Sequence, residues 1–370
     1  MTIELMQVND PASMELFLDV PSRVLAGHQH HVEDIKSEAR RFFDQDNPFW
    51  RRTGTALYVV KKHDLPVGRI AWFMDMAYHE HANEQVGYFG YCDAVNQKDV
   101  WQALMEKAES DLQARGMRTI RGPINGTIGN QVGILTSGFH LDPQPLMAYN
   151  PIHYLHQIEQ LGYRKCRDLH AYHIRLDSPR AIEAASFHPS ADVTTRPFDR
   201  HRMDEELELL RVLINKGMEH HWQSRPWGKE EFFYLIKEMK MLYFPQMVQF
   251  ALVHGEYAGV IISYPNINML LKKYDGRMGI RQRMDFLLRL HKIKEAKVEL
   301  ICVSPEYRGH GVGKALLAAV MRHLIAAGYR ELEYSWVVED NEASKHLARS
   351  FGGVPYKRYR VLEKALNRMT

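Results

Sequence analysis

The strongest constraint on the fold of this chain is a repeat at the scale of a whole domain. A strand pattern at 86–91 precedes an amphipathic helix pattern at 100–115, which stops at Gly116. The same order returns 212 residues later, at 298–303, 313–327 and Gly328. The strand patterns that follow, at 118–124 and 330–336, keep this offset. Because two stretches share one order of elements, the chain is predicted to fold as two similar halves.

The segments around this repeat extend the similarity. Hairpin patterns precede it in both halves, and a short helix followed by a strand-like tail comes after it, at 167–174 and at 357–362. This order predicts a mixed α/β fold with a strand–helix–strand crossover in each half. Three prolines between 177 and 199 mark the join. The predicted domains are therefore 1–180 and 190–370.

The composition excludes several classes of protein. With 370 residues, 45% apolar and 25% charged, the chain resembles an ordinary globular protein of two domains. We find no apolar run of membrane-spanning length and no signal-peptide pattern. Cys92, Cys166 and Cys302 are widely spaced, which favours a reducing cytoplasm without structural zinc. The histidine clusters lack metal-ligand spacing, so no metal is expected. A net charge of +3 gives no support for a nucleic-acid partner.

The motif that carries chemistry is a glycine-rich turn between the strand at 298–303 and the helix after it. It reads Arg308-Gly309-His310-Gly311-Val312-Gly313-Lys314. Glycines allow a ligand to approach the backbone closely, and the first turn of a helix presents unpaired N–H groups. Such a turn is typical of a phosphate or pyrophosphate site, to which Arg308 and Lys314 would add positive charge.

This motif has four possible interpretations. Three are known kinds of ligand-binding loop, and the fourth is a glycine-rich helix start that binds no ligand. A Walker loop requires Ser or Thr where Ala315 stands, and a dinucleotide fingerprint requires a different glycine spacing. Arg308-x-x-Gly311-x-Gly313 instead resembles the acyl-coenzyme A (acyl-CoA) loop of the GNAT acetyltransferase family. The segment from Asn341 to Leu347 is similar to the family's next helix, which packs beside the pantetheine arm.

The resemblance extends over nearly the whole chain. Gly122-Pro-Ile-Asn125, Tyr149-Asn150-Pro151 and the segment from Ser335 to Asn341 resemble bacterial tandem GNAT proteins related to the bacterial ceramide synthases. This resemblance implies two tandem GNAT folds, an acyl-CoA co-substrate and an amine acceptor. The coenzyme-binding residues that it implies are Ile301, Cys302, Val303, Arg308, Gly309, His310, Gly311, Val312, Gly313, Lys314 and Asn341.

The implied chemistry is direct attack of an amine on the thioester, with the enzyme positioning both partners. The backbones of Ile301 and Cys302 are candidates to stabilise the oxyanion. Glu299 is a candidate base, and strand alternation predicts that it shares a face with Ile301. Tyr334 is a second catalytic candidate, and Glu333 is a rival base. The Cys302 thiol itself is expected to be structural.

The chain departs from the family at the proton donor. Many members carry Tyr after the motif leucine, where this chain has Ala348. Tyr356, Tyr359 or water could substitute as the acid that protonates the leaving thiolate.

The first half lacks the glycine turn and is expected to bind no coenzyme. Asn96, Asp99 and Trp101 stand where the second half has Arg308, Gly311 and Gly313. The first half also has 22 extra residues within 121–154, rich in glycine and proline. They suggest either an acceptor-binding loop, with Asn125, Asn150 and Tyr154 as substrate-binding candidates, or a structural loop.

A basic segment at 266–297 is a further insertion. It contains nine Lys or Arg against three acids, and Met284, Phe286, Leu287, Leu288, Leu290 and Ile293 are predicted to form one apolar face. A lid over an acyl chain, a membrane-surface contact and a surface helix packed on its own domain all fit this pattern. The packed surface helix is the preferred interpretation.

The sequence thus favours an acyl-CoA-dependent N-acyltransferase that transfers acetyl to an amine. The alternatives are a long-chain transferase that resembles ceramide synthases and acts on a lipid amine, and a regulatory protein that binds acyl-CoA without turnover. Acyl-chain length, acceptor identity and oligomeric state stay open.

Overall fold

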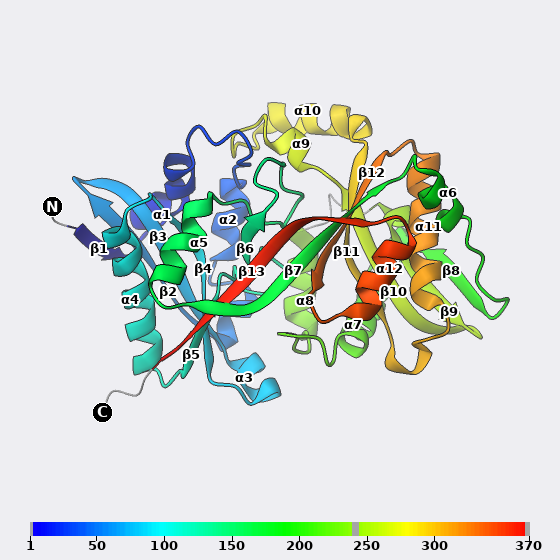
Figure 1. The fold of residues 1–370 in the computed structure, drawn as a ribbon, viewed down its shortest axis with the longest axis horizontal. Coiled ribbons are helices and arrows are strands. Elements are labelled where there is room, and N and C mark those ends of the chain that lie inside the picture. The colour runs from blue at the N-terminus through cyan, green and yellow to red at the C-terminus, as the bar shows by residue number, and fades with distance from the viewer. Residues whose placement is uncertain (1–2, 239–243, 367–370) are drawn as a thin grey trace. The chain divides into compact units, whose positions relative to one another are not determined.

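The computed structural model describes residues 3–238 and 244–366 and has the predicted mixed α/β fold (Figure 1). The chain forms two compact units. The first contains 1–169, 268–286 and 357–370, and the second contains 170–267 and 287–356. The predicted domains were contiguous, whereas these units are not, because β7 (Arg164–Arg175) and β13 (Val354–Ala365) each run from one unit into the other.

The first unit is built on a mixed sheet in the order β1-β2-β3-β4-β5-β13. Only β4 and β5 are parallel among its consecutive strands, and α4 connects them. The elements before the crossover are β1 (Ile3–Gln7), α1 (Pro11–Val24), α2 (Lys36–Phe42), β2 (Thr53–Lys62), β3 (Leu65–Asp75) and α3 (Met76–Ala82). The crossover and its sequel are β4 (Val86–Ala94), α4 (Lys98–Ala114), β5 (Thr119–Gly122), β6 (Ile134–Ser137) and α5 (Ile152–Gln160). Their core includes Trp72, Phe89, Trp101 and Leu104.

The second unit repeats this plan, as the sequence predicts. Its sheet has the order β7-β12-β11-β10-β9-β8, in which β11 and β12 are parallel and α11 connects them. The elements are α6 (Pro179–Ala185), β8 (Val193–Pro197), α7 (Met203–Gly217), α8 (Lys229–Glu238), β9 (Val248–Val253) and β10 (Glu256–Pro265), followed by β11 (Glu295–Val303), α11 (Val312–Ala326), β12 (Glu331–Val338) and α12 (Glu342–Ser350).

Helices cover both faces of this second sheet. One core joins the sheet to α11 and α6, through residues such as Val298, Leu316 and Ala181. The other joins it to α7 and α8, through residues such as Leu210, Phe232 and Cys302. The face on which a side chain of β11 lies therefore decides which of these two cores it meets.

The C-terminal strand completes the sheet of the first unit. Residues 362–365 of β13 pair antiparallel with 119–122 of β5, and residues 358–360 pair with β6. The segment within 121–154 that the sequence marks as an insertion supplies β6, so it contributes a strand to this sheet. Among the described residues, no helix is both long enough and apolar enough to cross a membrane.

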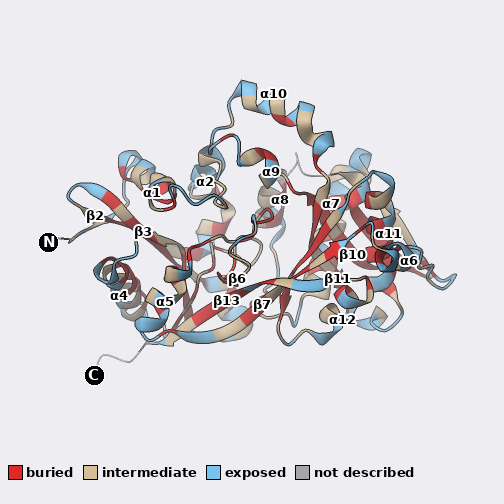
Figure 2. Cartoon of the chain, turned by 45° about the horizontal axis from the view of Figure 1, so that its top comes forward, coloured by how far each residue is buried: buried red, intermediate tan, exposed pale blue. Residues whose placement is uncertain are grey.

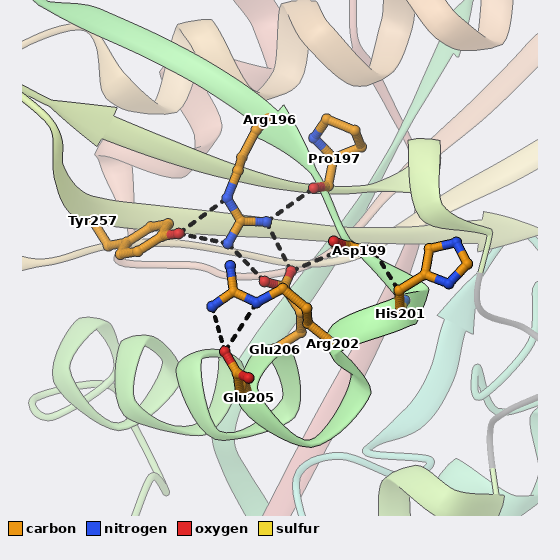
Figure 3. A network of polar contacts seen from close by, with 8 residues as sticks. All are labelled: Arg196, Pro197, Asp199, His201, Arg202, Glu205, Glu206 and Tyr257. Carbon is orange, nitrogen blue, oxygen red and sulfur yellow. Dashed lines mark hydrogen bonds and ion pairs between the residues drawn. The ribbon is translucent and has the colours of Figure 1, made fainter.

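A buried ion pair ties α7 to the edge of the second sheet (Figure 3). Arg196 on β8 donates two hydrogen bonds of 2.8 Å to the carboxylate of Glu206 on α7. Its guanidinium also donates to the Tyr257 hydroxyl and lies 4.6 Å from the centre of the Phe250 ring. The Glu206 side chain is 2% exposed. Because α7 packs against β10 and β11, this pair helps to hold the helix that backs the second sheet.

We predict that Glu206→Ala lowers the free energy of unfolding by about 2 kcal/mol, because it leaves the Arg196 cation beside a buried, apolar space. Urea denaturation followed by circular dichroism measures the change. Glu205→Ala is the matched control. Glu205 also lies on α7, but it pairs with Arg202 in solvent. Its loss should therefore lower the free energy of unfolding by less than about 0.5 kcal/mol. Equal losses in the two variants would contradict the role given to the buried pair.

Candidate functional site

The glycine turn has the geometry that an anion site requires. It lies between β11 and α11, and it starts with buried Ser304 and a short helical turn at Pro305–Tyr307. Gly309 and Gly311 have φ angles of 87° and 77°, which side chains rarely tolerate. Gly311 is the N-cap of α11 and supplies no side chain to cap the helix. The positive end of this 15-residue helix is thus left for a ligand.

The space around the turn is compatible with phosphate groups. A Cβ atom on Gly309 would meet no heavy atom within 4 Å, and one on Gly313 would meet only Leu347 at 3.5 Å. The packing of the chain therefore does not require glycine at 313, and the backbone there is open to close approach. Arg308, His310 and Lys314 are exposed beside the turn, so positive charge is available there.

Two contacts fix the Arg308 side chain next to the loop. Its guanidinium donates to the carbonyl of Gly217 at 3.1 Å and to that of Val303 at 3.4 Å. Asn341 has a different local role, because its side chain caps α12 by accepting from the backbone N–H of Ser344 at 3.0 Å. Asn341 thus fixes the start of the helix that the resemblance assigns to the pantetheine arm.

The two central strands of the second unit part next to the turn. Parallel pairing of β11 with β12 runs from Glu295 opposite Glu331 to Val298 opposite Tyr334, and ends there among the described residues. Both strands continue, β11 to Val303 and β12 to Val338. In the described structure, the β12-facing edge of residues 299–303 therefore has no strand partner. Ile301 and Cys302, the predicted oxyanion donors, lie in this stretch.

A bulge in β11 begins where the strands part. Ile262 of β10 lies opposite Leu300, but the next residue, Ser263, lies opposite Val298. Glu299 is the extra residue, so the regular alternation of side chains is interrupted at this point.

Because of the bulge, the Glu299 side chain does not lie on the predicted face of the sheet. Val298 and Ile301 pack into the α11 core, while Leu300 and Cys302 pack into the α7 core. Glu299 bonds with Lys297 and Tyr264, which lie on the α7 side, so it does not share a face with Ile301 and Val303. The prediction was wrong because it assumed uninterrupted alternation along β11.

Glu299 belongs to a buried cluster of polar residues. The Lys297 ammonium lies 2.7 Å from its carboxylate, and the Tyr264 hydroxyl donates to the same oxygen. The Lys297 side chain is only 1% exposed, whereas that of Glu299 is 20% exposed. Burial and the Glu299 charge raise the pKa of Tyr264 well above its usual range. Glu299 is thus the member of this trio that solvent, or an incoming amine, can reach.

A second part of the cluster surrounds Glu333 on β12. Glu333 lies opposite Lys297 in the parallel ladder, and its carboxylate accepts hydrogen bonds from the hydroxyls of Ser335 and Tyr356. The Glu333 side chain is buried, and Tyr356 is half-buried. The structure therefore brings Glu299, its rival Glu333 and Tyr356 to one face of the sheet.

Tyr334 lies on the opposite face. Its hydroxyl shares a 2.8 Å hydrogen bond with Ser344 on α12, and its ring packs into the α11 core. Burial raises the pKa of Tyr334 to about 12. Tyr334 is therefore separated by the sheet from the other two predicted catalytic residues. Tyr359, which the sequence suggested beside Tyr356 as a proton donor to the thiolate, is completely buried.

The Cys302 thiol has the surroundings of a structural group. It is buried, its pKa is raised to about 12 by burial, and its sulfur lies 3.6 Å from the Leu213 carbonyl. Two glycines make room for this part of β11. A Cβ atom on Gly217 would lie 2.7 Å from the Cys302 Cβ, and one on Gly259 would lie 2.6 Å from the Cys302 carbonyl oxygen.

The sequence reasoning missed Lys297 and Tyr264. The signal for Lys297 was present, because Glu295, Lys297 and Glu299 alternate with apolar residues along one strand. Tyr264 carried no local signal. It joins the cluster only because β10 pairs with β11, with Tyr264 opposite Lys297.

Comparisons with known proteins agree with this geometry. Residues 214–352 match the sequence profile described as the Acetyltransferase (GNAT) family. The fold is similar to that of a tandem GNAT protein from the clavulanic acid biosynthesis pathway, with a TM-score of 0.61 and 13% identity over 99% of both chains. The chain therefore has a tandem GNAT fold. Both the predicted resemblance and the predicted fold are thereby confirmed.

Two curated relatives are similar to this chain over almost its full length. One is the bacterial ceramide synthase of Caulobacter vibrioides, with 29% identity over 98% of each chain. The other is protein YghO of Escherichia coli, with 28% identity over 95% of this chain and 93% of the relative. A GCN5-related N-acetyltransferase from Sphaerobacter thermophilus has a similar fold, with a TM-score of 0.58 and 16% identity over 99% of this chain and 96% of the other.

In the first half of the chain, other residues stand at the positions of the glycine turn. Trp101 stands at the position of Gly313, is fully buried, and donates its indole N–H to the Val95 carbonyl at 3.0 Å. Asp99, at the position of Gly311, pairs with Lys62 at 3.3 Å. Trp101 thus fills the space at the start of α4, and the charge of Asp99 there is balanced by Lys62.

The three candidate acceptor residues have internal partners within the first unit. Asn125 accepts from the Tyr91 N–H at 2.7 Å, and Asn150 accepts from the Leu135 N–H at 2.7 Å. Tyr154 is buried against Trp101, and its hydroxyl lies 3.5 Å from Asp93. Each residue supports its own local structure, and acceptor binding by any of them stays a prediction.

Proposed function

We propose that this protein is an acyl-CoA-dependent N-acyltransferase that uses the second unit for coenzyme binding and chemistry. The parting of β11 and β12 beside the glycine turn is the observation that carries the proposal. The two features would provide a place for a diphosphate and, next to it, a strand edge unpaired with β12 for a thioester.

The turn supports coenzyme binding in a specific way. Backbone N–H groups at Gly311, Val312 and Gly313 would bind the pyrophosphate, with charge from Arg308 and Lys314. The backbone at Ile301 and Cys302 would receive the thioester carbonyl, because its β12-facing edge has no strand partner. The resident groups in this assignment are backbone amides and two cations, which fit an anionic diphosphate.

The buried polar cluster would perform the proton transfers. Glu299 would accept the proton of the incoming ammonium, and Lys297 and Tyr264 would act as positioning residues for its carboxylate. The amine nitrogen then forms its bond to the acyl carbon as the carbon–sulfur bond breaks. Tyr356, on the same face and half-buried, would donate its hydroxyl proton to the leaving thiolate. The acylated nitrogen would lose its second proton, which restores the Tyr356 hydroxyl, and Glu299 would release the first proton to solvent.

A long-chain acyl group and a lipid amine are a second candidate, beside transfer of acetyl. The observation that favours them is the similarity to the bacterial ceramide synthase over 98% of both chains. The glycine turn and the polar cluster are compatible with either acyl group, because in this proposal both would contact only the coenzyme and the reacting atoms.

We predict that Gly313→Ala weakens acyl-CoA binding by about tenfold, since the new methyl group would displace the pyrophosphate from one N–H donor. Isothermal titration calorimetry measures the affinity. The fold should persist because the added Cβ would meet Leu347 only at an ordinary contact distance. Gly228→Ala, in open space, is the control. Unchanged affinity in Gly313→Ala would remove the turn from the coenzyme site.

We expect Glu299→Gln to lower kcat by about 100-fold while acyl-CoA affinity is unchanged, because the amide cannot accept the proton. Stopped assays of thiol release measure turnover. Glu295→Gln on the same strand, where the carboxylate accepts from Asn266, should retain full activity. Turnover lost only in Glu333→Gln would transfer the role of base to Glu333.

Turnover of acetyl-CoA against palmitoyl-CoA, with polar and sphingoid amines as acceptors, distinguishes the two acyl groups. The lipid candidate predicts that palmitoyl-CoA with a sphingoid amine has the higher kcat/KM, by about tenfold or more, since burial of a long chain adds apolar contact. A preference for acetyl-CoA and a polar amine would contradict the lipid candidate. Tight binding without turnover on any acceptor would instead support a regulatory protein.

A further inference from the structure

Much of the helix α10 (Ile280–Arg289) is exposed to solvent (Figure 2), and its exposed residues include an apolar stripe. Ile280 is 80% exposed, and Met284, Leu287 and Leu288 are 60%, 63% and 69% exposed. These four positions have the spacing i, i+4, i+7 and i+8, so they lie on one side of the helix. We call them the α10 stripe. Phe286, on the other side, is buried and attaches the helix to the protein.

This arrangement differs from the one predicted from the sequence. Met284, Phe286, Leu287, Leu288, Leu290 and Ile293 were expected to form a single apolar face. The structure divides them, with Phe286 and Ile293 buried and Met284, Leu287 and Leu288 exposed. A helix packed on its own domain accounts for Phe286 but leaves the stripe without a role.

The concentration of the stripe also distinguishes it from ordinary surface. Eleven large apolar side chains are exposed in the described part of the chain, and four of them fall within the nine positions 280–288. Most of the others, such as Leu65, Ile182 and Val212, are on separate elements. Scattered apolar residues need no explanation, whereas a contiguous patch indicates an interaction surface.

Basic residues border the stripe on both sides. At about 100° per residue, Arg281 and Arg283 flank the sector that the four apolar side chains cover. Both are exposed, as are Lys273 and Arg277 just before the helix. Asp285, the acid within α10, accepts a hydrogen bond from the Tyr274 hydroxyl at 2.9 Å. The exposed border of the stripe is therefore positively charged.

We propose that α10 docks on the surface of a bilayer that contains anionic lipids. The α10 stripe would enter the boundary between headgroups and acyl chains, and Arg281 and Arg283 would lie at the level of the lipid phosphates. This inference is independent of the proposed function, because it concerns where the protein binds and not what it transfers.

Charge decides between this partner and the other occupants of such a surface. Two copies of the chain that met through the stripe would bring the arginines of both together, which is unfavourable. If α10 instead closed as a lid over an acyl chain, it would either bury Arg281 and Arg283 or leave the α10 stripe in water, and both outcomes are unfavourable. An anionic lipid surface satisfies the apolar residues and the cations together.

Sedimentation of the full chain with lipid vesicles tests the proposal. Vesicles of phosphatidylcholine mixed with phosphatidylglycerol should bind the protein roughly tenfold or more tightly than phosphatidylcholine alone. Replacing Ile280, Met284, Leu287 and Leu288 together with Gln should abolish binding to both. The matched control replaces four exposed apolar residues elsewhere with Gln, namely Leu65, Ile152, Ile182 and Val212, and should bind like the wild type.

A second variant separates charge from insertion. Arg281→Gln with Arg283→Gln should remove most of the preference for anionic vesicles, and added salt should do the same to the wild type. Every variant should keep the wild-type melting temperature and acyl-CoA affinity, so a loss of vesicle binding cannot come from unfolding or from loss of the coenzyme site. If the wild-type protein binds vesicles but turns over no acyl-CoA, the result would count against the proposed function and leave this inference standing.

Two results would overturn the inference. One is the absence of binding to either vesicle by the wild-type protein. The other is a dimer in sedimentation velocity that the variant with four Gln residues converts to a monomer, because the stripe would then be a surface between copies of the chain.

Discussion

The interruption of β11 at Glu299 is the constraint on which the rest of the second unit depends. Up to Val298 the strand pairs with β12 in a regular parallel ladder, and beyond it the two strands separate. The extra residue shifts the register against β10 and sends Glu299 and Leu300 toward the α7 side, while Ile301 returns to the α11 core. One residue therefore exposes a strand edge and also points a carboxylate into the polar cluster.

The buried polar cluster depends on this local geometry. Lys297 is almost completely buried, and such an ammonium is tolerated because Glu299 and Tyr264 surround it. The bulge places Glu299 within 2.7 Å of Lys297 and still leaves a fifth of its side chain accessible. Structural and chemical roles are thus combined in one carboxylate, which both neutralises a buried cation and faces solvent.

Much of this architecture could be predicted from the sequence, and the features that were not predicted share an identifiable cause. The repeat at 212 residues predicted both crossovers, and the bounds of α11 and β12 lie within one and two residues, respectively, of the predicted ones. The glycine turn could be recognised because its conformation is encoded locally, in Gly309 and Gly311. The bulge could not, because it depends on the pairing of β10 with β11, and a single sequence does not contain that register. The passage of β13 into the first unit is non-local in the same way, since its partner β5 lies more than 200 residues earlier.

The contrast between the two halves follows from what fills the start of each crossover helix. In α4, buried Trp101 and the pair formed by Asp99 and Lys62 occupy the space that glycines leave open in α11. An indole at this position contributes to the core of the first unit, whereas a glycine contributes nothing to packing there. The second unit therefore gives up packing at α11 to keep backbone N–H groups accessible, and the first unit does the reverse. A single scaffold can carry both solutions because the crossover itself is held by the sheet and not by the residues of the turn.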